Sequence, residues 1–138
     1  MRVSLAVLCD YANVTREGKL NIMGIFDTIF AQSFPARHTA MNLVLRLVAD
    51  PQEFGKTQRI SIQLMDEDGK RMFEAEAEML PQGQGSTPAN VDQILGLGNL
   101  VFPKPGTYCF SVVINGTHIR DHDVALKLAQ IDPQPRDS

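Results

Sequence analysis

The chain has 138 residues, of which 43% are hydrophobic and 21% are charged, as is typical of one ordinary globular domain. Its formal net charge is −3 and its lysines and arginines are scattered, which argues against the clustered basic surface that binds nucleic acid. No apolar segment reaches the roughly 18 residues that span a membrane, and the N-terminal apolar run lacks the small-residue cleavage site of an export signal. We therefore expect one soluble, cytoplasmic domain over residues 1–131, followed by a polar tail over residues 132–138.

The first part of the chain is predicted to be extended. Residues 3–12 and 19–26 are mostly apolar and flank a polar turn, so they are expected to form a β-hairpin. Pro35 removes a backbone donor and holds the preceding residue extended, which ends the next extended piece. In residues 41–48 every odd position is apolar and so are several even ones. This pattern predicts a central strand that is covered on both faces.

Two later segments alternate most clearly. Residues 58–64 and 72–79 place apolar side chains on one face and polar side chains on the other. The turn over residues 66–69, Asp-Glu-Asp-Gly, joins them into a predicted hairpin with one face in water. The outward positions of the second segment form an acidic stripe, which we expect to be a solvated sheet face: Glu74, Glu76 and Glu78. Residues 81–90 are rich in glycine, proline and glutamine and are predicted to be a mobile loop.

The C-terminal part completes the predicted sheet. Residues 91–97 are predicted to add a short helical turn, and residues 100–102, 108–114 and 124–128 to form strands. Seven to nine short strands without a long amphipathic helix indicate an all-β, antiparallel β-sandwich with an immunoglobulin-like or C2-like Greek key. A small closed barrel is the alternative.

The segment His-Ile-Arg-Asp-His-Asp at residues 118–123 resembles a metal site. It follows Asn115-Gly116, the dipeptide of a tight hairpin turn. Counting back from that turn would place Asp121 opposite Phe110 on the apolar face, so we expect a bulge or bend near residues 120–123 that changes the register. In a regular strand His118 and His122 lie about 13 Å apart, too far to share one zinc ion. The bent hairpin is therefore preferred.

Calcium is a separate hypothesis, because C2-like sandwiches gather aspartates from loops at one end. Hard cations prefer several carboxylate oxygens. The candidate ligands at predicted strand ends are Asp66, Asp68, Asp121 and Asp123, with Asp27 and Asp50 as further aspartates near such ends. Local hydrogen bonding within the turns explains the same residues without a metal, so convergence of the turns would decide between the two.

The sequence offers little for catalysis. Cys9 and Cys109 each lie in an apolar run, where a free thiol behaves as a small buried hydrophobe. Neither lies in a turn or at a helix N-terminus that would lower its pKa. His38 is the one histidine in a loop of distinctive composition and is the remaining candidate for a catalytic or ligand group. We therefore expect no enzyme activity and no cofactor.

Several segments together resemble a known family. They are LCDYA at residues 8–12, GKLNIMGIFD at residues 18–27, Phe34-Pro35 and GTYCF at residues 106–110, followed by Asn115-Gly116. The chain resembles a family of small bacterial proteins known only as a domain of unknown function. The resemblance implies a bacterial source and an all-β fold, and it implies no site residues.

The sequence thus predicts a binding or scaffolding module that recognises a protein partner through a sheet edge or strand-end loops, as exposed edges readily do. A ligand- or calcium-binding sandwich is the alternative. We expect neither nucleic acid nor a membrane as a partner, and self-association into a homo-oligomer is left open.

Overall fold

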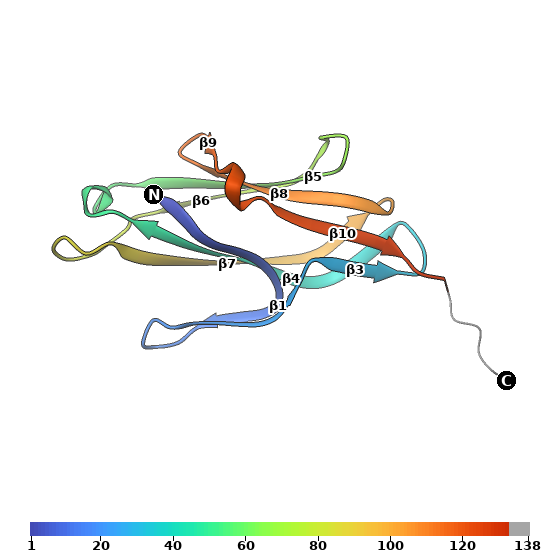
Figure 1. The fold of residues 1–138 in the computed structure, drawn as a ribbon, viewed down its shortest axis with the longest axis horizontal. Helices are drawn as coiled ribbons and strands as arrows, with labels where there is room; N and C mark the ends of the chain where they lie inside the picture. Colours follow the sequence, from blue (N-terminus) through green and yellow to red (C-terminus); the bar gives the residue numbers. More distant parts are fainter. Residues whose placement is uncertain (133–138) are drawn as a thin grey trace.

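The fold is a stack of two β-sheets, seen edge-on in Figure 1. The computed structural model describes residues 1–132, so the predicted polar tail lies outside the described residues except for its first position. Two short 3-10 turns, Pro51–Glu53 and Arg120–His122, interrupt the strands. The strands are β1 (Arg2–Val14), β2 (Leu20–Phe26), β3 (Thr28–Ala31), β4 (Ala36–Ala49), β5 (Gln58–Met65), β6 (Arg71–Met79), β7 (Ala89–Phe102), β8 (Gly106–Ile114), β9 (Thr117–His118) and β10 (Val124–Gln130).

The strand order defines the two layers. One sheet has four strands in the order β2-β1-β4-β7, and the other has six, in the order β3-β10-β8-β5-β6 with β9 beside β8. The prediction of an all-β, two-layer fold is confirmed, and the closed-barrel alternative is wrong. Two details are corrected: the described residues contain ten strands rather than seven to nine, and β3 pairs with β10 in parallel. The parallel pair arises because Asp27 alone links β2 to β3, so the chain changes sheets without reversing direction.

The core lies between the layers. Leu43, Leu45 and Leu47 of β4 point inward, as the odd-position pattern predicted, while Val44 and Val48 on the other face are also buried. This confirms that β4 is a central strand, since β1 and β7 flank it. Full burial of each such side chain stabilises the fold by roughly 1.5–3 kcal/mol. The largest fully buried side chains are Tyr108, Phe102, Phe110, Leu8, Met41, Leu43, Leu47, Leu64, Leu126, Leu128, Val44 and Val112.

The predicted helical turn at residues 91–97 is wrong. These residues belong to β7, which pairs with β4 from Ala89 to Phe102. Gln93 occupies an inward position opposite Leu45, and this polar residue breaks the alternation that identifies a strand. The predicted loop over residues 81–90 is correspondingly shorter, because β7 already begins at Ala89.

The His-Ile-Arg-Asp-His-Asp segment is a bent hairpin, as predicted. Asn115 and Gly116 have φ angles of 50° and 84°, which fits a turn that requires positive φ at both positions. Beyond β9 the 3-10 turn at Arg120–His122 inserts extra residues, so Phe110 pairs with Val124 and not with Asp121. This shift of three residues removes Asp121 from the apolar face, which is the physical reason for the bend.

Glu53 binds the N-terminal ammonium group, and this contact should make the stability of the fold depend on pH. Its carboxylate accepts hydrogen bonds from the Met1 ammonium group and from the Asp50 N–H, the latter at 2.9 Å. Burial alone would raise the pKa of Glu53, but these hydrogen bonds and the positive charges of Met1 and Lys56 outweigh it, so the pKa is lowered from its ordinary value of 4.5. A carboxyl group whose pKa is lower in the folded state stabilises the fold above its unfolded pKa, and this contribution is lost as the pH falls through the folded pKa.

We expect Glu53→Gln to lower the free energy of unfolding by about 1–2 kcal/mol at pH 7. The difference from wild type should shrink as the pH falls below 4.5. Urea denaturation of both proteins at pH 7 and pH 3 measures this, with the exposed Glu17→Gln as the control. An equal difference at both pH values would show that the charge of Glu53 contributes nothing.

Candidate functional site

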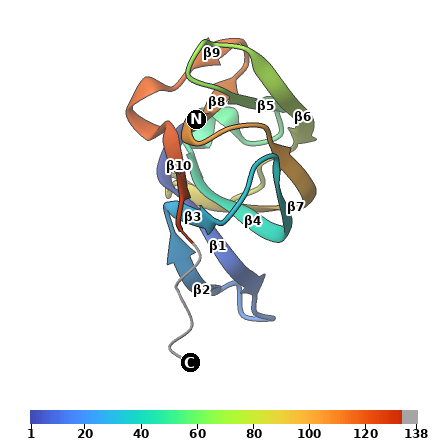
Figure 2. The ribbon, with the colours of Figure 1, turned by 90° about the vertical axis from the view of Figure 1, so that its right-hand side faces the viewer.

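One side of the sandwich is left open. β6 and β7 are the last strands of their sheets, so each has one edge without a neighbouring strand. The two edges lie on the same side, because residues of both strands line one cavity between the layers. On the opposite side Asp27 carries the chain from one sheet to the other. Figure 2 shows the layers from the end, with β6 and β7 together on one side.

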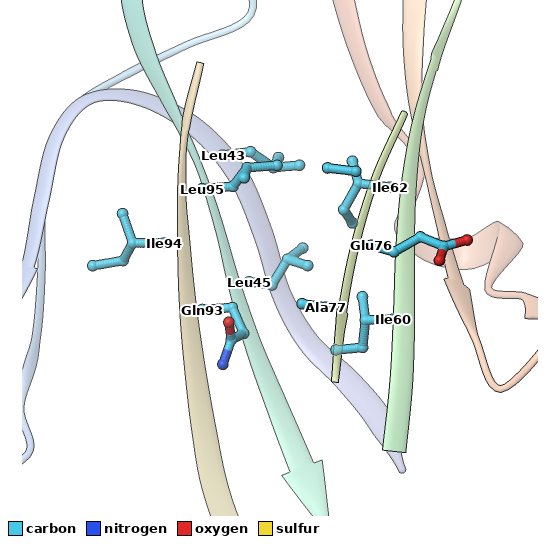
Figure 3. A pocket seen from close by; sticks show the side chains of 10 residues that line it. Leu43, Leu45, Ile60, Ile62, Glu76, Ala77, Gln93, Ile94 and Leu95 are labelled. Atoms are coloured by element: carbon cyan, nitrogen blue, oxygen red, sulfur yellow. The ribbon is translucent and has the colours of Figure 1, made fainter. Parts of the chain in front are cut away.

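The cavity between these edges, called here the edge slot, is mainly apolar. Figure 3 shows the side chains that line it, with β4 and β7 on one side and β5 and β6 on the other; Ile94 and Glu76 point away from the space between the sheets. On β6 the inward residues are Ala75 and Ala77, which lie opposite Ile62 and Ile60 of β5. Because alanine is small, β6 leaves the slot unfilled at the edge. The lining residues are Leu43, Leu45, Ile60, Ile62, Ala75, Glu76, Ala77, Gln93, Ile94 and Leu95.

The size of the slot limits what it can hold. Its volume is about 70 Å³, roughly half that of an engineered apolar cavity of ~150 Å³ that binds benzene. Pockets for small-molecule ligands and cofactors usually measure about 300–1,000 Å³. The slot therefore suits a single aliphatic side chain better than a whole cofactor.

The outer face of β6, beside the slot, is acidic. The predicted stripe on β6 is exposed, as expected. Glu74 pairs with Arg71 at 2.6 Å and Glu78 with Arg59 at 3.0 Å, whereas Glu76 has no ion pair within residues 1–132. Glu76 also lines an adjoining surface depression of about 280 Å³ together with Glu78, Ala77 and Arg59. One carboxylate without an ion pair among the described residues therefore lies on the outer face of β6, next to the open edge.

The aspartates proposed as calcium ligands form separate local contacts. Asp66 accepts hydrogen bonds from the backbone N–H groups of Asp68 and Lys70, both at 2.9 Å, and so stabilises its own turn. Asp68 lies 3.4 Å from Lys104. In the part of the chain that the structure describes, no three acidic, histidine or cysteine side chains are grouped closely enough to hold a metal ion.

The other two candidate aspartates belong to the bent hairpin. Asp123 lies 2.7 Å from Nε2 of His118, and Asp121 is exposed in the 3-10 turn at Arg120–His122. The His118 and Asp123 side chains are both about one-third exposed, at 36% and 32%. This pair therefore lies at the surface and is not enclosed in a pocket with a nucleophile.

The remaining candidates for chemistry are mostly packed into the sandwich. Burial raises the pKa of Cys9, and burial also raises the pKa of Cys109, helped by the charge of Asp123. Raised thiol pKa values disfavour nucleophilic chemistry. The His38 ring lies 6.0 Å from the Phe26 ring, and its Nε2 is buried without a hydrogen-bond partner. His38 shares a wide surface depression of about 430 Å³ with Asp10 and Thr28.

The edge slot cannot be recognised from the periodicity of the sequence. The alternation of residues 72–79 predicts that Ala75 and Ala77 face inward, and their small size is the one signal of an unfilled space. Gln93 lies in the segment predicted as a helical turn, and that prediction does not place it beside β4 in the wall of the slot. The missing information was the strand order that brings β6 and β7 to one side.

The fold and this edge define a two-layer β-sandwich with an open, apolar slot along one side. The chain belongs to a family of unknown function, DUF6941, whose profile matches residues 4–127. The predicted resemblance to a domain of unknown function is thereby confirmed. No curated protein matches the sequence. Across residues 1–132, no helix is long and apolar enough to cross a membrane.

Proposed function

We propose that this protein is a non-enzymatic binding module that captures an extended segment of a partner protein at the edge slot. The observation that carries the proposal is the combination of an unpaired β6 edge with an apolar cavity directly behind it. An unpaired edge offers a row of backbone N–H and C=O groups to an incoming strand. The cavity offers a place for one of that strand's side chains.

The binding mode follows from strand geometry. A segment that adds to β6 forms main-chain hydrogen bonds, and its successive side chains point to opposite faces of the sheet. The inward side chain of the segment enters the slot between Ala75 and Leu95. A small or medium aliphatic side chain fits the volume of about 70 Å³.

Charge selects the outward side chains of the segment. These lie beside the acidic stripe of β6, where Glu76 has no ion pair among the described residues. A lysine or arginine next to Glu76 would compensate that charge and steer association. The proposed partner segment therefore alternates aliphatic and basic residues. It needs no cofactor, and no bond is made or broken at this edge.

Selection from a library of random displayed peptides tests the proposal. The expected result is enrichment of sequences that alternate aliphatic and basic residues. Ala75→Leu fills the slot from within and should weaken binding of the selected peptides at least tenfold. Ala125→Leu makes the same change at an exposed position of β10 and should leave the affinity within about twofold.

A second variant separates charge from shape. Glu76→Lys should weaken binding of the basic peptides and reduce its dependence on salt concentration. The proposal is overturned if no peptide is enriched, or if Ala75→Leu and Ala125→Leu bind the selected peptides equally well.

A further inference from the structure

The hairpin formed by the outer parts of β1 and β2 projects from the sandwich. β1 pairs with β4 only as far as Cys9, and beyond that residue it pairs with β2 alone. Figures 1 and 2 both show this hairpin extending away from the two layers. We call residues 10–24 the arm. A two-stranded hairpin is at best marginally stable in water by itself, so the arm gains little from the core of its own chain.

The arm and its base carry exposed apolar side chains on one face. Tyr11 lies opposite Met23, and Ile25 lies opposite the buried Cys9, so all four side chains point the same way. Tyr11 is 54% exposed, and Met23 and Ile25 are each 62% exposed. We call these three side chains the apolar ridge. More than half of each of these side chains is therefore open to solvent.

Next to the apolar ridge, the same face of the four-stranded sheet carries mainly small side chains. The row that begins with Ile25 and Cys9 continues through Asn42 of β4 to Gly96 of β7. In the neighbouring row Ala40 pairs with Gly98. Ala40, Gly96 and Gly98 are exposed. These small residues and Asn42 form a surface that we call the glycine floor.

The fold does not require the glycines of this floor. Neither Gly96 nor Gly98 has a left-handed φ, and a Cβ atom at these positions would meet nothing closer than 3.6 Å and 3.8 Å, respectively. Glycine inside a strand weakens it and often marks the place where another backbone approaches closely. Something outside the chain is therefore the natural occupant of the floor.

We propose that the occupant is a second copy of this chain. The ridge and the floor lie side by side on one face, so a two-fold axis between them places the ridge of each copy on the floor of the other. Such a self-complementary patch is the requirement for a closed dimer. Arg46 and Asp92 also lie on this face, but they form an ion pair at 2.7 Å, so their charges cancel.

The exposed area of this face reaches the lower limit for a specific interface. Tyr11, Met23 and Ile25 together expose on the order of 350 Å². Each copy contributes both its ridge and its floor, on the order of 500 Å² per partner and about 1,000 Å² in total, which is the lower limit for a specific interface. The proposal goes beyond peptide capture, because this face is the outer side of the four-stranded sheet, whereas the edge slot lies between the inner faces.

Sedimentation of the full chain tests the proposal. At about 100 μM, where even micromolar affinity gives mostly dimer, the wild-type protein should sediment as a species of twice the chain mass of 15.3 kDa. Met23→Lys on the ridge and Gly96→Arg on the floor should each give a monomer with the wild-type circular dichroism spectrum. The monomer should tolerate Gly96→Arg, because position 96 is exposed and a Cβ atom there would meet only Asn42 Oδ1, at 3.6 Å.

Leu80→Lys is the matched control, since Leu80 is an exposed apolar residue at 51% but lies outside this face. It should leave the dimer intact. The proposal is overturned if the wild-type chain is monomeric at this concentration, or if a dimer survives both Met23→Lys and Gly96→Arg.

Discussion

Replacing Phe110 with alanine is expected to lower the free energy of unfolding by about 3–5 kcal/mol. Phe110 is 0% exposed and lies on β8, in the middle of the six-stranded sheet, between Leu64 of β5 and Val124 of β10. Its removal loses the apolar transfer energy of the ring and leaves a cavity that rigid neighbouring strands cannot close. The total free energy of unfolding of a domain of this size is about 5–15 kcal/mol. The Phe110→Ala variant should therefore be close to unfolding at 37 °C.

Urea denaturation followed by circular dichroism measures this loss. Phe30→Ala is the matched control, since the same side chain is 64% exposed on β3. Its cost should stay below about 0.5 kcal/mol. If both substitutions cost the same, the inner face of β8 has been wrongly assigned.

The sequence predicts most accurately the strands in which apolar and polar residues alternate. In β5 and β6, isoleucine and alanine alternate with charged or polar residues, and the register of the hairpin agrees with that pattern from Gln58 to Leu64. The bend after β9 was also predictable, because a straight hairpin would have buried aspartates. In each case a local rule and the tertiary structure favour the same answer.

β7 shows where local reasoning fails. Gln93 faces inward, Gly96 and Gly98 supply no side chain, and Asn99 has a φ of 55° beside the point where Leu100 and Phe102 become the inward residues. No segment of this strand therefore keeps a clean period of two. It is a strand because β4 supplies a partner along its whole length, and that partner is distant in the sequence.

The candidate site was hidden for a related reason. The inward alanines of β6 are visible in the sequence, but an open slot requires that β6 and β7 be the last strands of different sheets on the same side. Strand order depends on long-range pairing, which the periodicity of a single strand does not record. The aspartate-bearing turns illustrate the same point, since similar residues at strand ends need not meet.

One side of the sandwich is open along β6 and β7, and peptide capture depends on that opening. In an antiparallel ladder each strand directs alternate amides toward each side, so every second amide of these two strands should have no partner strand. Such amides exchange with solvent through small local motions, whereas amides of central strands exchange only when larger units open.

Amide hydrogen exchange of the free protein, resolved by residue with NMR, measures this most directly. Alternate amides of β6 (Arg71–Met79) and β7 (Ala89–Phe102) should exchange at least about a thousandfold faster than those of β5 and β8. Uniform protection along β6 and β7, equal to that of the central strands, would contradict this prediction and would mean that both edges are already covered.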